Sequence, residues 1–236
     1  MQLFADSADL DEIREWLRHG VIDGVTTNPS ILLKAGVFSV REGARAIARL
    51  LGDAPLSVEV VSDDPEDMVA RGREVAGWAS NIVVKVPVVT TGGDPCLSAI
   101  HALSEEGIRV NATACMTTGQ AMLAAKAGAA YVSLFAGRIA DEGLDASAVV
   151  SGVVRWLERW DYPARVIVGS IRGVIDIQSA ALAGAHVVTV PPRLLKQMVD
   201  HKYSRFTVQQ FLSDGEAALA RMIEAELEPR VEAQPR

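Results

Sequence analysis

Eight short segments rich in valine and isoleucine recur along the 236 residues, and amphipathic stretches separate them. The expected strands are residues 2–5, 24–27, 56–61, 82–86, 109–113, 131–135, 165–169 and 186–190. The expected helices between them include residues 64–80, 98–106, 117–127 and 146–160. Strand–helix alternation of this kind predicts βαβ units and a parallel sheet. Eight such units in a chain of this length indicate an α/β fold of the (β/α)₈ TIM barrel type.

An open, doubly wound sheet is the alternative fold, but no GxGxxG follows the first strand and no GxxxxGK[ST] occurs. After the last strand, Pro191-Pro192 precedes helices expected at residues 193–200 and 207–226. The second of these helices is surplus to the eight units and carries an apolar stripe that must pack against something. We expect one barrel domain over residues 1–228 that includes this additional C-terminal helix, and a disordered tail at 229–236.

Composition and charge argue against several kinds of protein. The net charge of −7 disfavours general binding to nucleic acid or to membrane surfaces. No apolar run reaches the length of a membrane span, and the first residues do not resemble a signal peptide. Cys96 and Cys115 fit no CxxC or zinc-binding spacing, which favours a reducing compartment. We therefore expect a cytoplasmic protein with neither nucleic acid nor membrane among its partners.

One lysine interrupts the fourth expected strand. Lys85 stands between Val84 and Val86 in a run that is typical of a strand buried on both faces. Burying an ammonium group costs free energy and favours the neutral amine, which can attack a carbonyl and form a Schiff base. The alternative is a lysine at the end of the strand whose ammonium group reaches solvent. The residues at the other strand ends help to decide between the two.

Polar residues gather at the carboxyl ends of the expected strands, where active sites of such barrels lie. They are Asp6, Thr27, Asn28, Glu59, Lys85, Asn111, Thr113, Ser133, Arg138, Ser170 and Arg172. Taken singly, each has a structural explanation, such as a helix cap, a satisfied core hydroxyl or a surface ion pair. Taken together they suit carbonyl chemistry on a phosphorylated sugar, because carboxylates move protons, amides bind hydroxyls and arginines bind phosphate.

Several blocks of the sequence resemble the transaldolase family, in the small-subunit branch that also contains fructose-6-phosphate aldolases. The similarity runs from Phe4 to about Asp214. The matching blocks are GVTTNPS at residues 24–30, IVVKVP at 82–87, AGAAYVS at 127–133, GRI at 137–139 and ALAGA at 181–185. The first two blocks, at this spacing, are a specific signal.

The resemblance implies roles for the polar residues. Lys85 matches the Schiff-base lysine and Asp6 the acid–base carboxylate. Glu59 and Thr113 match the pair that positions the catalytic water. Thr27, Asn28, Asn111 and Ser133 match the substrate-binding set, and Arg138, Ser170 and Arg172 match the phosphate site.

The resemblance also implies the setting of the enzyme. Its substrates are phosphorylated sugars of carbohydrate metabolism, as in the pentose phosphate pathway, and it uses no metal and no organic cofactor. The small-subunit branch assembles as homo-oligomers, so a pentamer or a decamer of two stacked pentamer rings is expected.

Two residues distinguish the activities within this family. The aldolases resembled here have tyrosine at the position of Phe135 and glutamine at that of Glu59. Both differences favour a transaldolase over the alternative, a lyase that releases free dihydroxyacetone from fructose 6-phosphate. A third alternative is a sugar-phosphate-binding barrel without catalysis, against which the presence of Lys85, Asp6 and Glu59 argues.

The sequence departs from the family pattern around the expected mouth of the site. The departures are the longer loop at residues 90–96, the stretch at 114–116, Leu134 and Gly173. They leave the imine chemistry intact and the acceptor sugar open. A pathway-specialised transaldolase with an unusual sugar-phosphate acceptor is therefore a further alternative.

Overall fold

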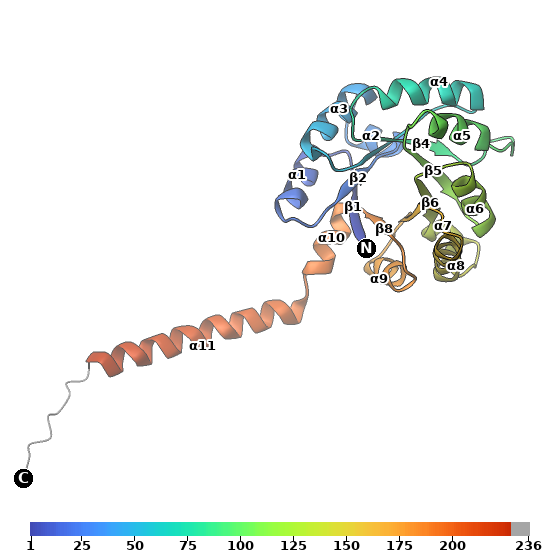
Figure 1. The fold of residues 1–236 in the computed structure, drawn as a ribbon. Helices are drawn as coiled ribbons and strands as arrows, with labels where there is room; N and C mark the ends of the chain where they lie inside the picture. Colours follow the sequence, from blue (N-terminus) through green and yellow to red (C-terminus); the bar gives the residue numbers. More distant parts are fainter. Residues whose placement is uncertain (228–236) are drawn as a thin grey trace, which may run out of the picture. The chain divides into compact units, whose positions relative to one another are not determined.

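The computed structural model describes residues 1–227. The chain divides into two compact units, residues 1–195 and residues from 196 onward, and each is described by itself. In the first unit eight parallel strands form a closed barrel, and helices form a ring around it (Figure 1). The predicted TIM barrel is therefore confirmed. The tail expected at residues 229–236 lies outside the described residues.

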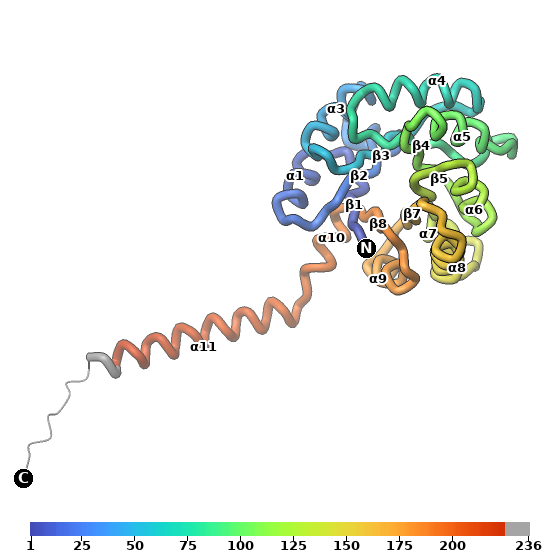
Figure 2. The backbone as a smooth tube through the Cα atoms, viewed as in Figure 1, coloured from blue at the N-terminus to red at the C-terminus, as the bar shows by residue number. Residues whose placement is uncertain are grey.

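The barrel strands follow one another in chain order. They are β1 (Gln2–Asp6), β2 (Gly24–Thr26), β3 (Leu56–Glu59), β4 (Ile82–Pro87), β5 (Val110–Cys115), β6 (Tyr131–Phe135), β7 (Arg165–Gly169) and β8 (Val187–Val190). All eight predicted strands are present, with small shifts at their ends. Figure 2 follows the chain around the ring to the point where β8 lies beside β1, and Phe4 pairs there with Thr189.

The helices fall between the strands and after the last one. They are α1 (Leu10–Arg18), α2 (Pro29–Lys34), α3 (Val40–Leu51), α4 (Pro65–Ala76), α5 (Leu97–Glu105), α6 (Thr118–Lys126), α7 (Ala136–Asp141), α8 (Ala146–Arg159), α9 (Val174–Leu182), α10 (Pro192–Val199) and α11 (Lys202–Leu227). The four predicted inter-strand helices are confirmed as α4, α5, α6 and α8. Helix α4 is shorter than predicted because Gly77 caps it, donating its N–H to the carbonyls of Arg73 and Glu74.

Successive side chains of each strand point alternately into the barrel and toward the surrounding helices. An apolar cluster is formed by Phe4, Val83, Tyr131, Ile167 and Val187. Because these side chains come from five different strands, they meet inside the barrel. The intervening residues of the same strands, such as Val84 and Val86, belong to the larger core that the surrounding helices cover.

A polar layer lies above this apolar floor. Two residues beyond Phe4, Val83, Tyr131 and Val187 the same strands carry Asp6, Lys85, Ser133 and Thr189, respectively. Side chains two residues apart on a strand point to the same face, so these four polar side chains also point inward. Since all strands are parallel, they gather at one end, the carboxyl end of the barrel.

The second unit contains α11, which begins earlier than the predicted helix at residues 207–226. Its large apolar side chains are exposed; they are Tyr203, Phe206, Val208, Phe211, Leu212, Leu219, Met222 and Ile223. Within residues 1–227, no helix combines the length and apolar character that crossing a membrane requires.

Candidate active site

Lys85 is buried inside the barrel with 5% of its surface exposed. Its Nζ donates a hydrogen bond to the carbonyl oxygen of Thr27 at 2.8 Å and lies 3.7 Å from Glu59 Oε2. In the sheet Glu59 and Asn111 are its direct neighbours, on β3 and β5 respectively. The side chain therefore does not reach solvent, which was the alternative for this lysine.

Two carboxylates share this environment with Lys85. Asp6 accepts a hydrogen bond from Thr26 Oγ1 at 2.7 Å. Burial raises the pKa of Asp6 above its ordinary value, although the charge of Lys85 and the bond from Thr26 oppose this. Burial likewise raises the pKa of Glu59 against the opposing charge of Lys85. Carboxyl groups whose pKa values are raised in a buried site are suited to accepting and returning protons.

Asp6 is free for this role because another residue caps the following helix. The carboxylate of Asp9 accepts hydrogen bonds from Asp11 N and Glu12 N at the start of α1. Asp6 therefore does not cap the helix, which was one structural explanation for a polar residue at a strand end. Downstream, Asn28 does act as a cap, accepting a bond from Ile31 N at the start of α2.

A buried hydrogen-bond network orients the neighbouring amide and hydroxyl groups. Asn111 Nδ2 donates to Ser57 Oγ at 3.2 Å, and Ser133 Oγ donates to Asn111 Oδ1 at 2.7 Å. Thr27 Oγ1 donates to the carbonyl of Ser57 at 2.8 Å. Thr113 Oγ1 is buried and forms no hydrogen bond within residues 1–227. The network fixes Asn111 and leaves Thr113 as a buried hydroxyl available to a small polar ligand.

These groups border a cavity of about 190 Å³, which we call the Lys85 cavity. It is lined by Asp6, Thr26, Asn28, Lys85, Ser133, Phe135, Arg138, Gly169, Ser170 and Thr189. The cavity thus brings together seven of the residues expected from the sequence. Thr27, Glu59, Asn111 and Thr113 are outside this lining, and the first three are connected to it by the contacts above.

Thr26 and Thr189 line the Lys85 cavity and were not among the expected site residues. Their hydroxyls share a hydrogen bond, and Thr26 Oγ1 also bonds to Asp6. Strand alternation contained the necessary signal, since Thr189 follows the inward-facing Val187 by two residues.

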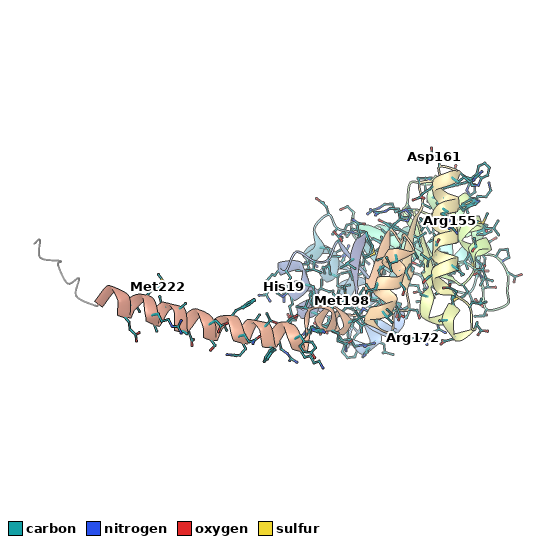
Figure 3. All side chains as sticks on the ribbon, turned by 90° about the horizontal axis from the view of Figure 1, so that it is seen from below. His19, Arg155, Asp161, Arg172, Met198 and Met222 are labelled. Carbon is teal, nitrogen blue, oxygen red and sulfur yellow. The ribbon has the colours of Figure 1, made fainter. Side chains whose placement is uncertain are left out.

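Arg172 differs from the other expected residues in its position. Its guanidinium forms a two-pronged ion pair with the carboxylate of Asp141 in α7, and both side chains are largely exposed. It lies outside the lining of the Lys85 cavity. Figure 3 nevertheless shows Arg172 at the end of the barrel opposite Asp161, which precedes β7, so it belongs to the end that holds Lys85.

Comparison with known proteins agrees with this geometry. Residues 3–233 match the family model described as transaldolase/fructose-6-phosphate aldolase. The chain belongs to this family. It is 43% identical over 217 residues to a probable transaldolase of Heliobacterium modesticaldum, covering 92% of this chain and 98% of that protein. Probable transaldolases of a Thermoanaerobacter species and of Dehalococcoides mccartyi are 41% and 38% identical, each covering more than nine-tenths of both chains.

Membership of the transaldolase/fructose-6-phosphate aldolase family makes the chain a transaldolase-type enzyme. The cavity residues lie where such an enzyme needs them, at the carboxyl ends of the barrel strands. Among residues 1–227, no three histidine, cysteine, aspartate or glutamate side chains come together as a potential metal site.

Proposed function

We propose that this protein is a transaldolase that moves a dihydroxyacetone unit from a ketose phosphate to an aldose phosphate through an imine at Lys85. The observation that carries the proposal is the position of Lys85, a buried amine facing a cavity that also contains the carboxylate of Asp6. Fructose 6-phosphate and sedoheptulose 7-phosphate are suitable donors, because each has a ketone beside a hydroxymethyl group.

The first step is attack of Lys85 Nζ, once it has given up a proton, on the ketone of the donor. Loss of water then gives the imine, which acts as an electron sink for the bond that must break. The carbonyl of Thr27 and the carboxylate of Glu59 approach Nζ from the β2 and β3 sides. Both hold the amine in place, and the carboxylate of Glu59 can accept and return a proton as the carbinolamine forms and collapses.

Carbon–carbon cleavage follows when a base removes the proton from the donor's C4 hydroxyl. Asp6 lines the same cavity as Lys85, and its raised pKa suits a group that first accepts and later returns this proton. The aldose phosphate leaves, and the three-carbon unit remains on Lys85 as an enamine. An acceptor aldehyde then reacts with it, and hydrolysis of the new imine releases the product.

Water is released when the imine forms and is consumed when the imine is hydrolysed, so a water molecule must be placed beside Lys85. Glu59 and Thr113 support its placement, since Glu59 Oε2 lies 3.7 Å from Lys85 Nζ and Thr113 has an unpaired buried hydroxyl within the described chain. Asn28, Asn111 and Ser133 would bind the hydroxyls of the three-carbon unit. Arg138 and Ser170, which line the cavity, would bind the phosphate.

The lyase activity found in the same family is the alternative function, and the dependence on an acceptor separates the two. With fructose 6-phosphate alone, the wild-type enzyme should release glyceraldehyde 3-phosphate slowly, because the enamine on Lys85 waits for an acceptor. Addition of an aldose phosphate should accelerate the release greatly. Testing a panel of donors and acceptors in this assay identifies the natural pair. Equal rates with and without an acceptor would favour the lyase.

Replacing Phe135 with tyrosine is expected to shift the enzyme toward cleavage. Phe135 lines the Lys85 cavity, so a tyrosine hydroxyl there would reach the space in which water and protons are exchanged. We expect release of free dihydroxyacetone without acceptor to rise by about tenfold or more. Phe135→Leu, which removes the ring without adding a hydroxyl, is the control, and an equal rise in that variant would contradict the role of the hydroxyl.

We also propose that the protein assembles as a homo-oligomer in the cytoplasm, as a pentamer or a decamer. The exposed apolar side chains of α11 support assembly, because packing them against a neighbouring subunit removes them from water. Cys96 and Cys115 are buried and unpaired, which agrees with a reducing compartment.

The assembly is tested by light scattering after size exclusion. A mass several times the 25.2 kDa of one chain is expected. Removal of residues 202–236 should reduce that mass while the circular dichroism of the barrel persists. A mass of one chain at micromolar concentration would contradict the proposed assembly.

A further inference from the structure

Arg172 is bound by a carboxylate that no sequence motif indicated. Both terminal nitrogens of Arg172 donate to Asp141, one to each carboxylate oxygen. The side chains are 57% and 51% exposed, so water reaches the pair. An ion pair in such a position contributes little to the free energy of unfolding. The guanidinium of Arg172 can therefore exchange the carboxylate of Asp141 for another anion.

Gly137, in the first turn of α7, allows Ser170 and Arg172 to approach the backbone of that helix closely. A side chain at this position would lie 2.8 Å from Arg172 Nε and 2.9 Å from Ser170 Oγ, so glycine is required. Ser170 lines the Lys85 cavity and Arg172 does not, although the side chains of both lie beside the position that a Cβ atom of residue 137 would take. Arg172 is therefore held close to a residue of the cavity while it stays outside the cavity lining.

The carboxylates near Arg172 differ in what they bind. Asp176 accepts hydrogen bonds from the backbone N–H groups of Arg172 and Gly173, and so is occupied with capping α9. Asp141 binds the guanidinium itself. The hydrogen bonds from Arg172, and further the charge of Arg138, hold the pKa of Asp141 below its ordinary value. Asp141 is thus ionised at neutral pH and interacts with both arginines.

We propose that Asp141 is a positioning residue, which holds Arg172 outside the Lys85 cavity until the phosphate of a sugar substrate replaces it as the partner of the guanidinium, and which thereby competes with phosphate and tunes the affinity for phosphorylated sugars. This inference rests on the proposed function and adds an exchange step to it. A phosphate dianion accepts the two-pronged bond of an arginine as well as a carboxylate does, and carries more charge. An unphosphorylated sugar offers no such partner, so Arg172 remains on Asp141 and contributes nothing to its binding.

The test compares Asp141→Asn with the wild type on phosphorylated and unphosphorylated donors. Asparagine keeps the size of the side chain and removes the charge that competes with phosphate. We expect KM for fructose 6-phosphate to fall about two- to fivefold, the range for an exposed ion pair that no longer has to be broken. The KM for fructose and the kcat for both donors should stay unchanged. Inorganic phosphate should inhibit the variant more strongly than the wild type, and Asp141→Glu should behave like the wild type.

Two further variants show whether the effect passes through Arg172. Glu142→Gln makes the same change of charge one residue along and should leave KM unaltered, which excludes a general electrostatic effect. In an Arg172→Ala background, Asp141→Asn should have a much smaller effect on KM, because the exchanging partner is missing and only the weaker interaction of Asp141 with Arg138 remains. The inference is overturned if Asp141→Asn raises or does not alter KM for fructose 6-phosphate, or if it lowers KM equally without Arg172.

Failure of the proposed function gives a different result. In that case the wild type neither transfers nor cleaves with any ketose phosphate, whatever residue 141 is. Calorimetric titration with inorganic phosphate then still tests Asp141, since tighter binding to Asp141→Asn than to the wild type does not depend on turnover. Equal affinity of the two proteins for phosphate would overturn the inference.

Discussion

Replacing Lys85 with methionine is expected to lower kcat/KM for transfer by at least about 10⁴-fold, as for the loss of other covalent nucleophiles. Methionine has a similar length and no amine, so it cannot form the imine on which cleavage depends. The remaining cavity can still bind the sugar phosphate. We therefore expect the loss to fall on kcat, measured in the coupled assay with donor and acceptor both present.

Folding of this variant should be intact. Lys85 is 5% exposed, and an apolar side chain of similar volume preserves the packing but leaves the carbonyl of Thr27 and the carboxylate of Glu59 without their partner. The thermal unfolding midpoint should therefore fall moderately, while the circular dichroism of the barrel stays that of the wild type. Lys126→Met is a matched control, because Lys126 is bonded to Tyr162 outside the Lys85 cavity and its loss should leave kcat unchanged. Full activity in Lys85→Met would exclude an imine at this residue.

Replacing Asp6 with asparagine is expected to lower kcat by about 10²- to 10⁴-fold, the usual contribution of a positioned general base. Asparagine can accept the hydrogen bond from Thr26 and therefore preserves the local geometry. It cannot take the proton whose removal breaks the carbon–carbon bond. Asp9→Asn is the matched control, since asparagine caps a helix as well as aspartate does and Asp9 lies outside the Lys85 cavity.

The pH dependence gives this prediction a second readout. The base must be ionised, so wild-type kcat/KM should fall as the pH drops through the pKa of Asp6, which is raised above the ordinary value of 3.8. That acidic limb should be absent from the residual activity of Asp6→Asn. A wild-type profile that stays flat down to the ordinary range of aspartate would contradict Asp6 as the base.

The Asp6→Asn substitution should lower the activity and raise the free energy of unfolding. Because folding raises the pKa of Asp6, the folded state binds more protons than the unfolded state above pH 3.8, and the ionised carboxylate destabilises the fold. Asp6→Asn should therefore be more stable than the wild type at neutral pH, and the difference should shrink as the pH falls toward 3.8. Denaturant unfolding at several pH values measures it. A variant that is both inactive and less stable at neutral pH would indicate structural damage instead.

Much of the fold was predictable because the sequence patterns that indicate strands and helices are local. Parallel strands covered on both sides are continuous apolar runs, and helices break those runs at regular intervals. The errors lie where a local signal was weak. Helix α4 ends at Ala76 rather than at residue 80, because Gly77 stops it within a stretch whose composition still favours a helix. Strand β5 continues to Cys115, through Ala114 in a left-handed conformation that the sequence does not reveal.

The site was predictable in part for a related reason. Lysine and carboxylates at strand ends are unusual enough to be noticed in a sequence, and the barrel brings those ends together. Threonine in a strand is common, so Thr26 and Thr189, although polar residues of their strands, were not predicted as site residues, and yet they line the cavity. The partner of Arg172 was not predictable either, since Asp141 lies 31 residues away and meets it only after α7 and the β7–α9 connection have folded.

The contacts of the loop at residues 90–96 were likewise not predictable from the sequence. The sequence revealed that it is longer than usual but not what holds it. In the structure Thr91 N donates to Asp63 Oδ1 at 2.7 Å, which ties the loop to the segment after β3. An antiparallel bridge between Val89 and Pro95 closes it. Contacts of this kind depend on the distance between two loops in the folded chain, which no pattern in either loop encodes.

The central claim is that Lys85 forms a covalent imine with the ketose, and borohydride trapping tests it most directly. The wild type is incubated with fructose 6-phosphate and borohydride, digested, and examined by mass spectrometry. A reduced three-carbon adduct is expected on the peptide that contains Lys85, dependent on substrate and absent from Lys85→Met. An adduct on another lysine, or an active enzyme that yields no substrate-dependent adduct, would contradict it.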